Sequence, residues 1–344
     1  MIPDTGTVLV RVPNWIGDTV MATGGLAMLR RVRPAVTLAV LAKPWVTSVI
    51  AHHPAVDQIL HHNPRHFPRR IVDFCDTCCR IRRLAPNAGL LLHKNFESAL
   101  LFFMSGVPIR IGRPTDSRGP LLTQRITLDS DILTGHQVHH YHTIVAKAAA
   151  CAPGNDPPRV YVSDSDRSAA QQVIDRLPGS GPIIPLAPGA AHGAAKCWPP
   201  VRVAGWIDRA VRRWDARVVL LGGVRESALS ERISSMTQQP VFTLAGGYPL
   251  LTQAAVIAQA GICIANDSGL MHLAAALPGV RVVALFGPTI PRETAPYGAG
   301  HIVIHHPPAC WPCKHRSCPE DHDCMMGISA EQVIDAVETI LQCG

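Results

Sequence analysis

The stretch ICIANDSGLMHLAAALPGVRVVALF, residues 262–286, decides the fold. An apolar run of strand length from Ile262 to Ala265 precedes a helical pattern from Leu270 to Leu277, and a second apolar run follows from Val280 to Phe286. Short apolar runs on either side of a helix are typical of a βαβ unit in a parallel sheet. The stretch therefore predicts an α/β protein, in which ligands bind beyond the carboxyl ends of the strands.

The alternation of strands and helices extends upstream through the second half of the chain. The predicted strands there are Ile183–Ala187, Arg217–Leu221 and Val241–Leu244, and the predicted helices are Pro200–Trp214, Glu226–Met236 and Leu250–Ala260. This order is that of a doubly wound sheet. A last amphipathic helix is predicted from Ala330 to Leu341.

The first half follows the same pattern. Its first predicted helix runs from Asp18 to about Arg31, and its predicted strands are Thr7–Val12, Val36–Leu41, Ile71–Phe74, Ala88–Leu92 and Ile109–Gly112. Pro, Gly, Asn and Asp gather between Cys151 and Pro158, as they do in exposed linkers. We therefore expect a Rossmann-like domain over residues 1–158, a second over residues 159–328, and a terminal helix within residues 329–344.

Composition limits the class of protein. Of the 344 residues, 47% are hydrophobic and 17% are charged, which suits compact domains with buried sheets. No apolar run approaches the roughly 20 residues of a membrane span, and the N-terminus lacks the basic start and apolar core of a signal peptide, so we expect a cytoplasmic protein. The net charge of +7 favours phosphorylated ligands or an acidic membrane surface over long duplex DNA.

Three turns between a strand and a helix carry candidate chemistry. The first contains Asn14, Gly17 and Asp18, where the glycine allows a tight turn and a carboxylate stands at a helix start. A base that removes a proton from a sugar hydroxyl needs this placement. Asp18 could equally be only the N-cap of the helix, and the two roles do not exclude each other.

The second turn is PGAAHGAAKCWP, residues 188–199, a loop of small side chains with Lys196 near its end. Small side chains let backbone N–H groups approach phosphate oxygens, and the lysine adds a positive charge. The loop is not a Walker A motif, and a plain connection from strand to helix remains the alternative.

The third turn, residues 266–272, again follows an apolar strand. Asp267 could accept hydrogen bonds from sugar hydroxyls, while the N–H groups after Ser268 and Gly269 would suit a phosphate. His272 lies on the first helical turn, where a packed and hydrogen-bonded role is commoner for histidine than a ligand contact.

Together these segments resemble glycosyltransferase family 9, the ADP-heptose:lipopolysaccharide heptosyltransferases, and most closely its heptosyltransferase II branch. The matching text is VPNWIGDTVM, PGAAHGAAKCWP and NDSGLMHLAAALPGVRVVALFGPT, followed by Pro291 and Thr294. The pieces lie in both halves in the order of that family. The resemblance implies a GT-B fold: two Rossmann-like domains facing a central cleft, with the terminal helix folding back on the N-terminal domain.

The resemblance also implies roles for residues that match the motifs of the family. It gives Asp18 as general base, Lys196 as the donor-phosphate lysine, Asp267 as the heptose-contacting acid, and Ser268 and Gly269 as diphosphate contacts. The adenosine ribose would lie at Gly222, Gly223 and Glu226, and His272 would also belong to the donor site. Some relatives have hydroxyl residues in place of Ala190 and Ala191. In this chain the side-chain hydroxyl contacts to phosphate are therefore missing, and backbone groups of Gly189, Ala190 and Ala191 would contact the phosphate instead.

The activity implied by the resemblance is an inverting, metal-independent transfer of heptose from ADP-heptose to the lipopolysaccharide inner core, with heptosylated Kdo-lipid A as acceptor. ADP-heptose would be a substrate, and no cofactor is expected. Such an enzyme would work in the cytoplasm, at the inner face of the inner membrane, without a nucleic-acid partner. The alternatives are a family member that uses another nucleotide sugar or an O-antigen acceptor, and a non-catalytic nucleotide-sugar-binding protein.

We expect the acceptor to bind the first domain. Lys94 and Asn95 follow a strand, and three arginines occur in a Gly- and Pro-rich stretch: Arg110, Arg113 and Arg118. With Asn14, these groups would suit a phosphorylated or carboxylated sugar. The alternative is that the arginines are ordinary exposed side chains.

No metal site is assigned. The stretch with Cys310, Cys313, Cys318 and Cys324 begins with the CxxC spacing of a zinc knuckle, but its other spacings are irregular, so zinc, a disulfide and a packed loop of thiols all stay open. Two Asp-x-Asp strings, residues 129–131 and 164–166, could suggest a metal-dependent transferase, but the second is typical of a helix cap and the first lies in a polar connection. A packing role is expected for His139, His140 and His142.

Overall fold

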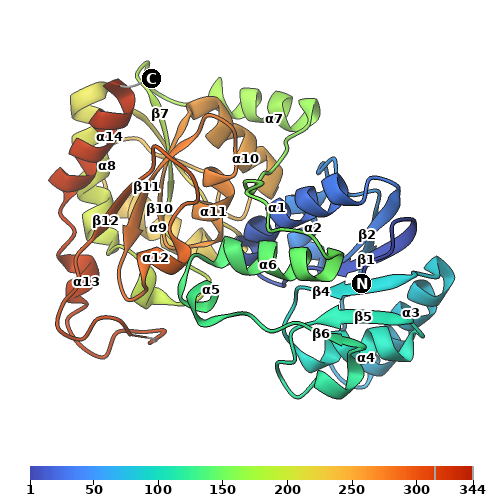
Figure 1. Cartoon of the computed structure of the whole chain (residues 1–344). Helices are drawn as coiled ribbons and strands as arrows, with labels where there is room; N and C mark the ends of the chain where they lie inside the picture. The colour runs from blue at the N-terminus through green and yellow to red at the C-terminus, as the bar shows by residue number, and fades with distance from the viewer. Residues whose placement is uncertain (314, 343–344) are drawn as a thin grey trace. The chain divides into compact units, whose positions relative to one another are not determined.

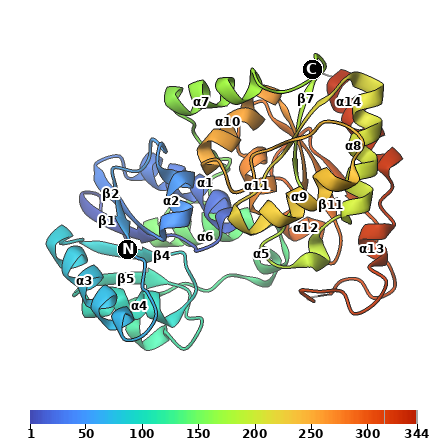
Figure 2. The same cartoon turned by 180° about the vertical axis from the view of Figure 1, so that it is seen from behind.

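The computed structural model describes residues 1–313 and 315–342, and it divides the chain into two compact units, Met1–Tyr161 and Val162–Gly344 (Figures 1 and 2). The division falls just after the predicted linker, three residues beyond the expected boundary. Residues 152–163 carry neither helix nor strand. None of the helices in the described ranges combines the length and apolar character that crossing a membrane requires.

The first unit contains a parallel sheet of six strands. The strands are β1 (Gly6–Arg11), β2 (Val36–Ala42), β3 (Gln58–His61), β4 (Ala88–Leu91), β5 (Ile109–Gly112) and β6 (Gln124–Arg125), in the order β3-β2-β1-β4-β5-β6. All of the pairings are parallel. The central strands β1, β2 and β4 are mostly buried, and most of their residues are apolar for this reason.

The helices of the first unit cover both faces of this sheet. They are α1 (Ile16–Val32), α2 (Pro44–Ile50), α3 (Arg69–Leu84), α4 (Phe96–Met104), α5 (Ser130–Thr134), α6 (Gln137–Ala149) and the 3₁₀ helix η1 (Gly119–Leu121). Helix α1 packs against α2 and α6, whereas α3 packs against α4. Cys78 and Ile81 of α3 and Phe102 of α4 form a core with Leu9 and Leu91 of the sheet.

Two sequence predictions in this unit are wrong. Residues 71–74 are predicted as a strand but form the first turns of α3, and the true strand β3 comes earlier. Residues 71–74 are IVDF, and so short a run with three apolar residues fits a strand and a helix equally well. Strand β3 is short and only partly buried, so its sequence, QILH, carries little of the apolar signal of the other strands.

The second unit repeats the topology of the first. Its strands are β7 (Ile183–Ala187), β8 (Arg217–Leu220), β9 (Phe242–Thr243), β10 (Ile262–Asn266), β11 (Arg281–Phe286) and β12 (Ile302–His305), in the order β12-β11-β10-β7-β8-β9. All of the pairings are parallel, with Ile262 opposite Arg281 and Ile264 opposite Leu186. The predicted doubly wound α/β fold is therefore confirmed in both units.

The helices of the second unit are α7 (Asp164–Ile174), α8 (Pro200–Trp214), α9 (Ser227–Met236), α10 (Leu250–Ala260), α11 (Gly269–Ala275), α12 (Pro291–Thr294), α13 (Asp323–Met326) and α14 (Ala330–Gln342), with 3₁₀ helices η2 (Ala194–Lys196) and η3 (Val224–Glu226). On one side of the sheet α8 packs against α9 and α14, and on the other α10 packs against α7 (Figure 1).

Helix α14 corrects one expectation. It is predicted to pack back on the N-terminal domain, yet its apolar residues join the core of the second unit. Val333 and Val337 are fully buried with Trp206 and Ile207 of α8, and Arg213 of α8 pairs with Glu338 at 2.7 Å. The amphipathic pattern predicted the helix itself, but it could not identify the surface that covers the apolar face. Residues 343–344 of the predicted terminal segment lie outside the described residues.

The two strand orders decide where ligands can bind. In each sheet the order reverses between two adjacent central strands, β1 and β4 in the first unit and β7 and β10 in the second. Crevices form beyond the carboxyl ends of strands at such switch points. Asp18 follows β1 and Lys94 follows β4, while Gly189 follows β7 and Asp267 follows β10.

Candidate active site

Asp18 is oriented by a buried tyrosine. The residue lies in the first turn of α1, where the helix dipole favours a carboxylate, and its Oδ1 accepts a hydrogen bond of 3.0 Å from the hydroxyl of Tyr141 on α6. Tyr141 is 4% exposed, and burial together with the charge of Asp18 raises the pKa of its phenol well above the usual value. Tyr141 therefore keeps its proton and holds the carboxylate in place.

The alternative reading of Asp18 as an N-cap is wrong. Trp15 occupies the N-cap position of α1, and its side chain makes no capping hydrogen bond. Gly17 is helical and does not have the positive φ that a tight turn would require. Asp18 therefore lies in the first turn of the helix, two residues beyond its first residue, and not at the N-cap position.

Two basic residues predicted for the acceptor follow strands of the same sheet as Asp18: Lys94 follows β4, which pairs with β1, and Arg113 follows β5. Burial, with a smaller contribution from the positive charges of Lys94 and Arg113, lowers the pKa of His140 on α6, the helix that carries Tyr141. Arg113 and Lys94 therefore stay candidates for contact with an anionic substrate.

Arg110 and Arg118 have structural roles instead. Arg118 is completely buried, and its Nε donates to the carbonyl of Arg113 at 2.8 Å while Nη1 donates to the carbonyls of His93 and Asn95. Arg110 donates to the carbonyls of Val107 and Leu121 at 2.6 and 2.7 Å. These bonds brace the loops around β5 and give both arginines a structural role, while Nη2 of Arg118 has no hydrogen-bond partner among the described residues.

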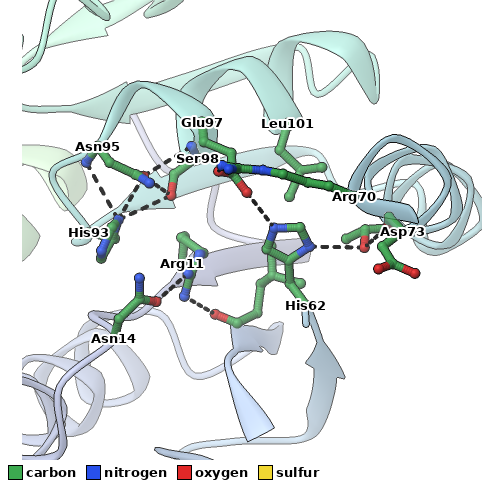
Figure 3. A network of polar contacts seen from close by, with 12 residues as sticks. Arg11, Asn14, His62, Arg70, Asp73, His93, Asn95, Glu97, Ser98 and Leu101 are labelled. Carbon is green, nitrogen blue, oxygen red and sulfur yellow. Dashed lines mark hydrogen bonds and ion pairs between the residues drawn. The ribbon is translucent and has the colours of Figure 1, made fainter. Parts of the chain in front are cut away.

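A polar pocket of about 260 Å³ opens at the carboxyl ends of β1–β4 (Figure 3). Asn14 and Asn95 line it, as do basic residues that the sequence did not single out: Arg11, Lys43, His62, Arg65, His66 and Arg70. Asn95 also caps α4, where its Oδ1 accepts from the N–H of Ser98 at 3.1 Å. Asn14 accepts from Nη2 of Arg11 at 2.5 Å.

Arg11 lines this pocket although its side chain is almost completely buried, with 1% exposed. Its Nη1 donates to the carbonyl of Val12 at 2.6 Å, and its Nε has no hydrogen-bond partner among the described residues. Burial lowers the pKa of Arg11 to about 10, so the group is still charged at neutral pH. A buried cation with an unused hydrogen-bond donor is stabilised when an anion binds beside it.

Glu97 is the acidic residue among those that line the pocket, and its charge is already used (Figure 3). It accepts from Nε2 of His62 at 3.0 Å and pairs with Arg70. The bond from His62, followed by the contact with Arg70, lowers the pKa of Glu97 to about 2, although burial opposes this. Burial lowers the pKa of His62, so the ring is neutral and Arg70 is the cation that balances Glu97.

Lys43 adds a second uncompensated charge. No carboxylate in the described ranges forms an ion pair with it, and Arg65 nearby is held by Asp73 at 2.6 Å. Burial, followed by the positive charge of Arg11, lowers the pKa of Lys43 to about 8. Arg11 and Lys43 together make the pocket attractive to an anion near neutral pH.

In the second unit Lys196 and Asp267 form an ion pair. Nζ of Lys196 lies 2.5 Å from Oδ2 of Asp267, and the side chains are 15% and 5% exposed. The hydroxyl of Thr289, after β11, donates to the same oxygen at 2.7 Å. The ion pair thus connects the loop after β7 with the turn after β10, two segments that the sequence predicts to form one site.

Asn266 fixes these two turns together, a role the sequence did not reveal. Its Nδ2 donates to the carbonyl of Pro188 at 2.6 Å, and its Oδ1 accepts from the N–H of Trp198 at 3.2 Å. Ser268 follows at the N-cap of α11, and its hydroxyl has no hydrogen-bond partner among the described residues. His272 is buried in α11, as expected for a packed residue.

Gly189 and Glu226 pack against each other. A Cβ on Gly189 would lie 2.4 Å from Cγ of Glu226, so only glycine allows this approach. Oε2 of Glu226 accepts a hydrogen bond from the N–H of Gly223 at 2.9 Å. Gln253 accepts from the N–H of Gly222 and donates to its carbonyl, both at 3.0 Å. The predicted residues Gly189, Gly222, Gly223 and Glu226 therefore form one cluster, with Ala190 and Ala191 in the adjoining loop.

The cysteine-rich stretch supports the loop of Lys196. The N–H of Ala195 donates to the carbonyl of Arg316 at 3.0 Å, and Nε2 of His322 lies 2.8 Å from the carbonyl oxygen of Ala195. The cysteines among the described residues are free thiols, and no group of three or more potential ligands in that part of the chain could hold a metal. The disulfide is thus not formed here.

The Asp-x-Asp strings also have structural roles. Asp166 completes a capping box with Ser163 at the start of α7, as the sequence suggested for this string. Asp129 stands at the N-cap position of α5 and lies 3.6 Å from Nζ of Lys147. Neither string follows a strand of its sheet at a switch point.

Comparison with known proteins identifies relatives over the whole chain. The model of Glycosyltransferase family 9 (heptosyltransferase) matches residues 80–323. Lipopolysaccharide heptosyltransferase 2 of Salmonella typhimurium is 27% identical over 97% of this chain and 98% of its own length. The protein of the same name from Escherichia coli is 26% identical over 97% and 98%, respectively.

Solved structures agree with the fold. The structure of E. coli ADP-heptose lps heptosyltransferase II is similar to this chain with a TM-score of 0.84 at 25% identity, over 98% of both chains. A family 9 glycosyl transferase from Veillonella parvula gives 0.85 at 23% identity, over 98% of this chain and 97% of its own. The predicted fold class, GT-B with two doubly wound Rossmann-like domains, is confirmed.

Proposed function

Because the chain belongs to glycosyltransferase family 9, we propose that it transfers heptose from ADP-heptose to the inner core of lipopolysaccharide, with heptosylated Kdo-lipid A as acceptor. Two observations carry the proposal: the first unit has an oriented carboxylate at its switch point, and the second unit has the Lys196–Asp267 ion pair at its own. Relatives named lipopolysaccharide heptosyltransferases match over nearly the whole chain. ADP-heptose is a substrate in this proposal, and no cofactor takes part.

Asp18 is the general base of the proposed reaction. The acceptor hydroxyl gives its proton to Asp18 while its oxygen bonds to the anomeric carbon of the heptose. The bond from that carbon to the diphosphate oxygen breaks in the same step, so ADP leaves and the anomeric configuration inverts. Tyr141 keeps the carboxylate oriented toward the hydroxyl throughout.

The second unit holds the donor in this proposal. Lys196 and the N–H groups of the small-residue loop at Gly189, Ala190 and Ala191, with those at Ser268 and Gly269, stabilise the diphosphate as it gains charge. Gly222, Gly223 and Glu226 receive the ribose. Asp267 and His272 lie on the side of the heptose, and Asp267 reaches its hydroxyls once the diphosphate draws Lys196 away.

The donor and the metal requirement are tested together by assaying a panel of nucleotide sugars with and without EDTA. We expect ADP-heptose to be turned over with release of ADP, and EDTA to leave the rate unchanged, because Lys196 and backbone donors replace the divalent cation. Preferential use of a UDP-sugar would overturn the donor assignment. Rescue of an EDTA-treated enzyme by magnesium or manganese would overturn metal independence.

The pocket of Arg11 and Lys43 receives an anionic group of the acceptor in this proposal. A phosphate or carboxylate on a core sugar would meet a buried guanidinium and an ammonium that lack carboxylate partners in the described chain. Lys94 and Arg113, which follow the neighbouring strands β4 and β5, would contact the same acceptor. The partners are thus a nucleotide sugar and a lipid-anchored saccharide, without nucleic acid, at the cytoplasmic face of the inner membrane.

This placement predicts a pH dependence. The pKa of Lys43, lowered to about 8, means that its ammonium is lost as the pH rises through that value. We expect kcat/KM for the acceptor to fall by roughly tenfold or more across this limb, because a contact between an ion and a charged group contributes about 1.5–3 kcal/mol. The variant Lys43→Arg keeps its positive charge over this pH range, so its kcat/KM should not fall as the pH rises through 8. A wild-type profile that is flat between pH 7 and pH 9, or an unchanged limb in Lys43→Arg, would contradict it.

A further inference from the structure

Residues 65–72 form an exposed surface that combines basic and apolar side chains. Every residue of the segment is exposed, and Phe67, Ile71 and Val72 are 80%, 58% and 64% exposed. The other members are His66, Pro68 and three arginines, and there is no acidic residue in the segment. We call these eight residues, which precede α3 and form its first turn, the α3 entry surface.

The apolar side chains of this surface do not belong to the core. The buried residues of α3 are Thr77, Cys78 and Ile81, and they lie in the later turns of the helix, which pack on α4 and the sheet. Ile71 and Val72 precede these turns and stay in solvent. Three large apolar side chains gathered at one exposed place are typical of an interaction surface, whereas single exposed ones are ordinary.

Charge identifies the kind of partner. Residues 65–84 carry six arginines against two aspartates, a formal +4 out of the +7 of the whole chain. Asp73 is held by Arg65 and has its pKa lowered to about 2, so it does not attract a basic partner. Arg69 forms no ion pair within the described residues. Arg65 and Arg70 are paired with Asp73 and Glu97, but the segment keeps its net positive charge, so it favours a partner that is anionic as well as apolar.

We propose that the α3 entry surface docks on an anionic lipid bilayer, with Phe67, Ile71 and Val72 inserted among the headgroups and Arg69 on a lipid phosphate. Basic and apolar side chains presented together are what binding at the interface of such a bilayer requires. Arg65, His66 and Arg70 also line the pocket of Arg11 and Lys43. The docked surface thus places the pocket at the membrane, where an acceptor with a lipid anchor presents its sugars. This last step rests on the proposed function.

The test is sedimentation of the full chain with lipid vesicles. We expect the wild type to bind phosphatidylcholine vesicles that contain phosphatidylglycerol, to bind vesicles of phosphatidylcholine alone much less, and to be released by salt. The triple variant Phe67→Ser, Ile71→Ser, Val72→Ser should lose roughly tenfold or more in binding. The matched control is Val201→Ser with Val224→Ser, which changes two apolar residues of the second unit that are 62% and 78% exposed and should bind as the wild type does.

Three outcomes would overturn the proposal. The first is a wild type that does not bind anionic vesicles, and the second is equal loss in the triple and control variants. The third is a wild type that self-associates in sedimentation velocity and a triple variant that is monomeric with unchanged vesicle binding, because the surface would then hold a second copy of the chain.

Activity separates this proposal from the proposed function. The triple variant should transfer sugar to a deacylated, water-soluble acceptor at the wild-type rate, and should be slower only on an acceptor embedded in vesicles. Transfer to neither acceptor by a wild type that binds vesicles would overturn the proposed function and leave the membrane surface intact.

Discussion

Asp18→Asn is expected to reduce kcat by roughly 100-fold or more while ADP binding stays nearly unchanged, because a positioned general base contributes about that much. The amide keeps the shape of the side chain and can still accept from Tyr141, but it cannot take the proton of the acceptor hydroxyl. Steady-state kinetics and calorimetry of ADP binding measure the two effects. Thermal unfolding should change little, since Trp15 and not Asp18 occupies the N-cap and a favourable dipole contact contributes only about 0.3–1 kcal/mol.

Tyr141→Phe is the matched comparison for this variant. It removes the hydroxyl that donates to Oδ1 of Asp18 and leaves the buried ring in place. We expect a smaller loss in kcat than for Asp18→Asn, because the base is still present but less well oriented. Near-normal turnover in Asp18→Asn, with early unfolding, would show that the carboxylate is structural.

Lys196→Ala is expected to lower kcat/KM by roughly tenfold to hundredfold, or about 1.5–3 kcal/mol, and to weaken ADP binding as well. The ammonium meets a diphosphate that is charged in the ground state and gains charge as the glycosidic bond breaks. Lys196→Arg should recover part of the activity, because its planar fork presents donors differently.

The ion pair adds an effect on stability that must be separated from the effect on activity. Asp267 is 5% exposed, so loss of the ammonium leaves a buried carboxylate with Thr289 as its remaining side-chain donor. Removing one partner of such a pair is destabilising, whereas removing both charges is much less so. The double variant Lys196→Ala, Asp267→Asn should therefore regain stability without regaining activity. Unchanged kinetics and unchanged ADP affinity in Lys196→Ala would remove this lysine from the site.

Much of the fold could be predicted because buried parallel strands are distinctive. The apolar runs that begin at Ile183, Ile262 and Val280 are separated by helical patterns of ordinary length. The strands predicted from these runs agree with β7, β10 and β11 to within one residue at each end. Strand β3 and the start of α3 were missed because the first is short and partly exposed, while the second opens with a strand-like IVDF. The packing of α14 depends on a surface built by α8, β11 and β12, which no local pattern describes.

The candidate site was predictable where its residues follow one another along the chain. The turns of Asp18, Gly189 and Asp267 carry compact motifs, and the structure joins Lys196 to Asp267. The acceptor pocket was not predictable in the same way, because Arg11, Lys43, His62 and Glu97 follow or end four different strands and meet only in the folded sheet. The complete burial of Arg118 was not predictable, because a buried loop arginine looks the same in sequence as an exposed one.

The measurement that tests the central claim most directly is the mass of the acceptor after incubation of purified protein with ADP-heptose and heptosylated Kdo-lipid A. We expect the acceptor to gain the mass of one heptose residue, with one ADP released for each transfer, and we expect Asp18→Asn to form product at least about 100-fold more slowly. An acceptor whose mass stays unchanged, while a different nucleotide sugar or a different saccharide reacts, would contradict the assignment.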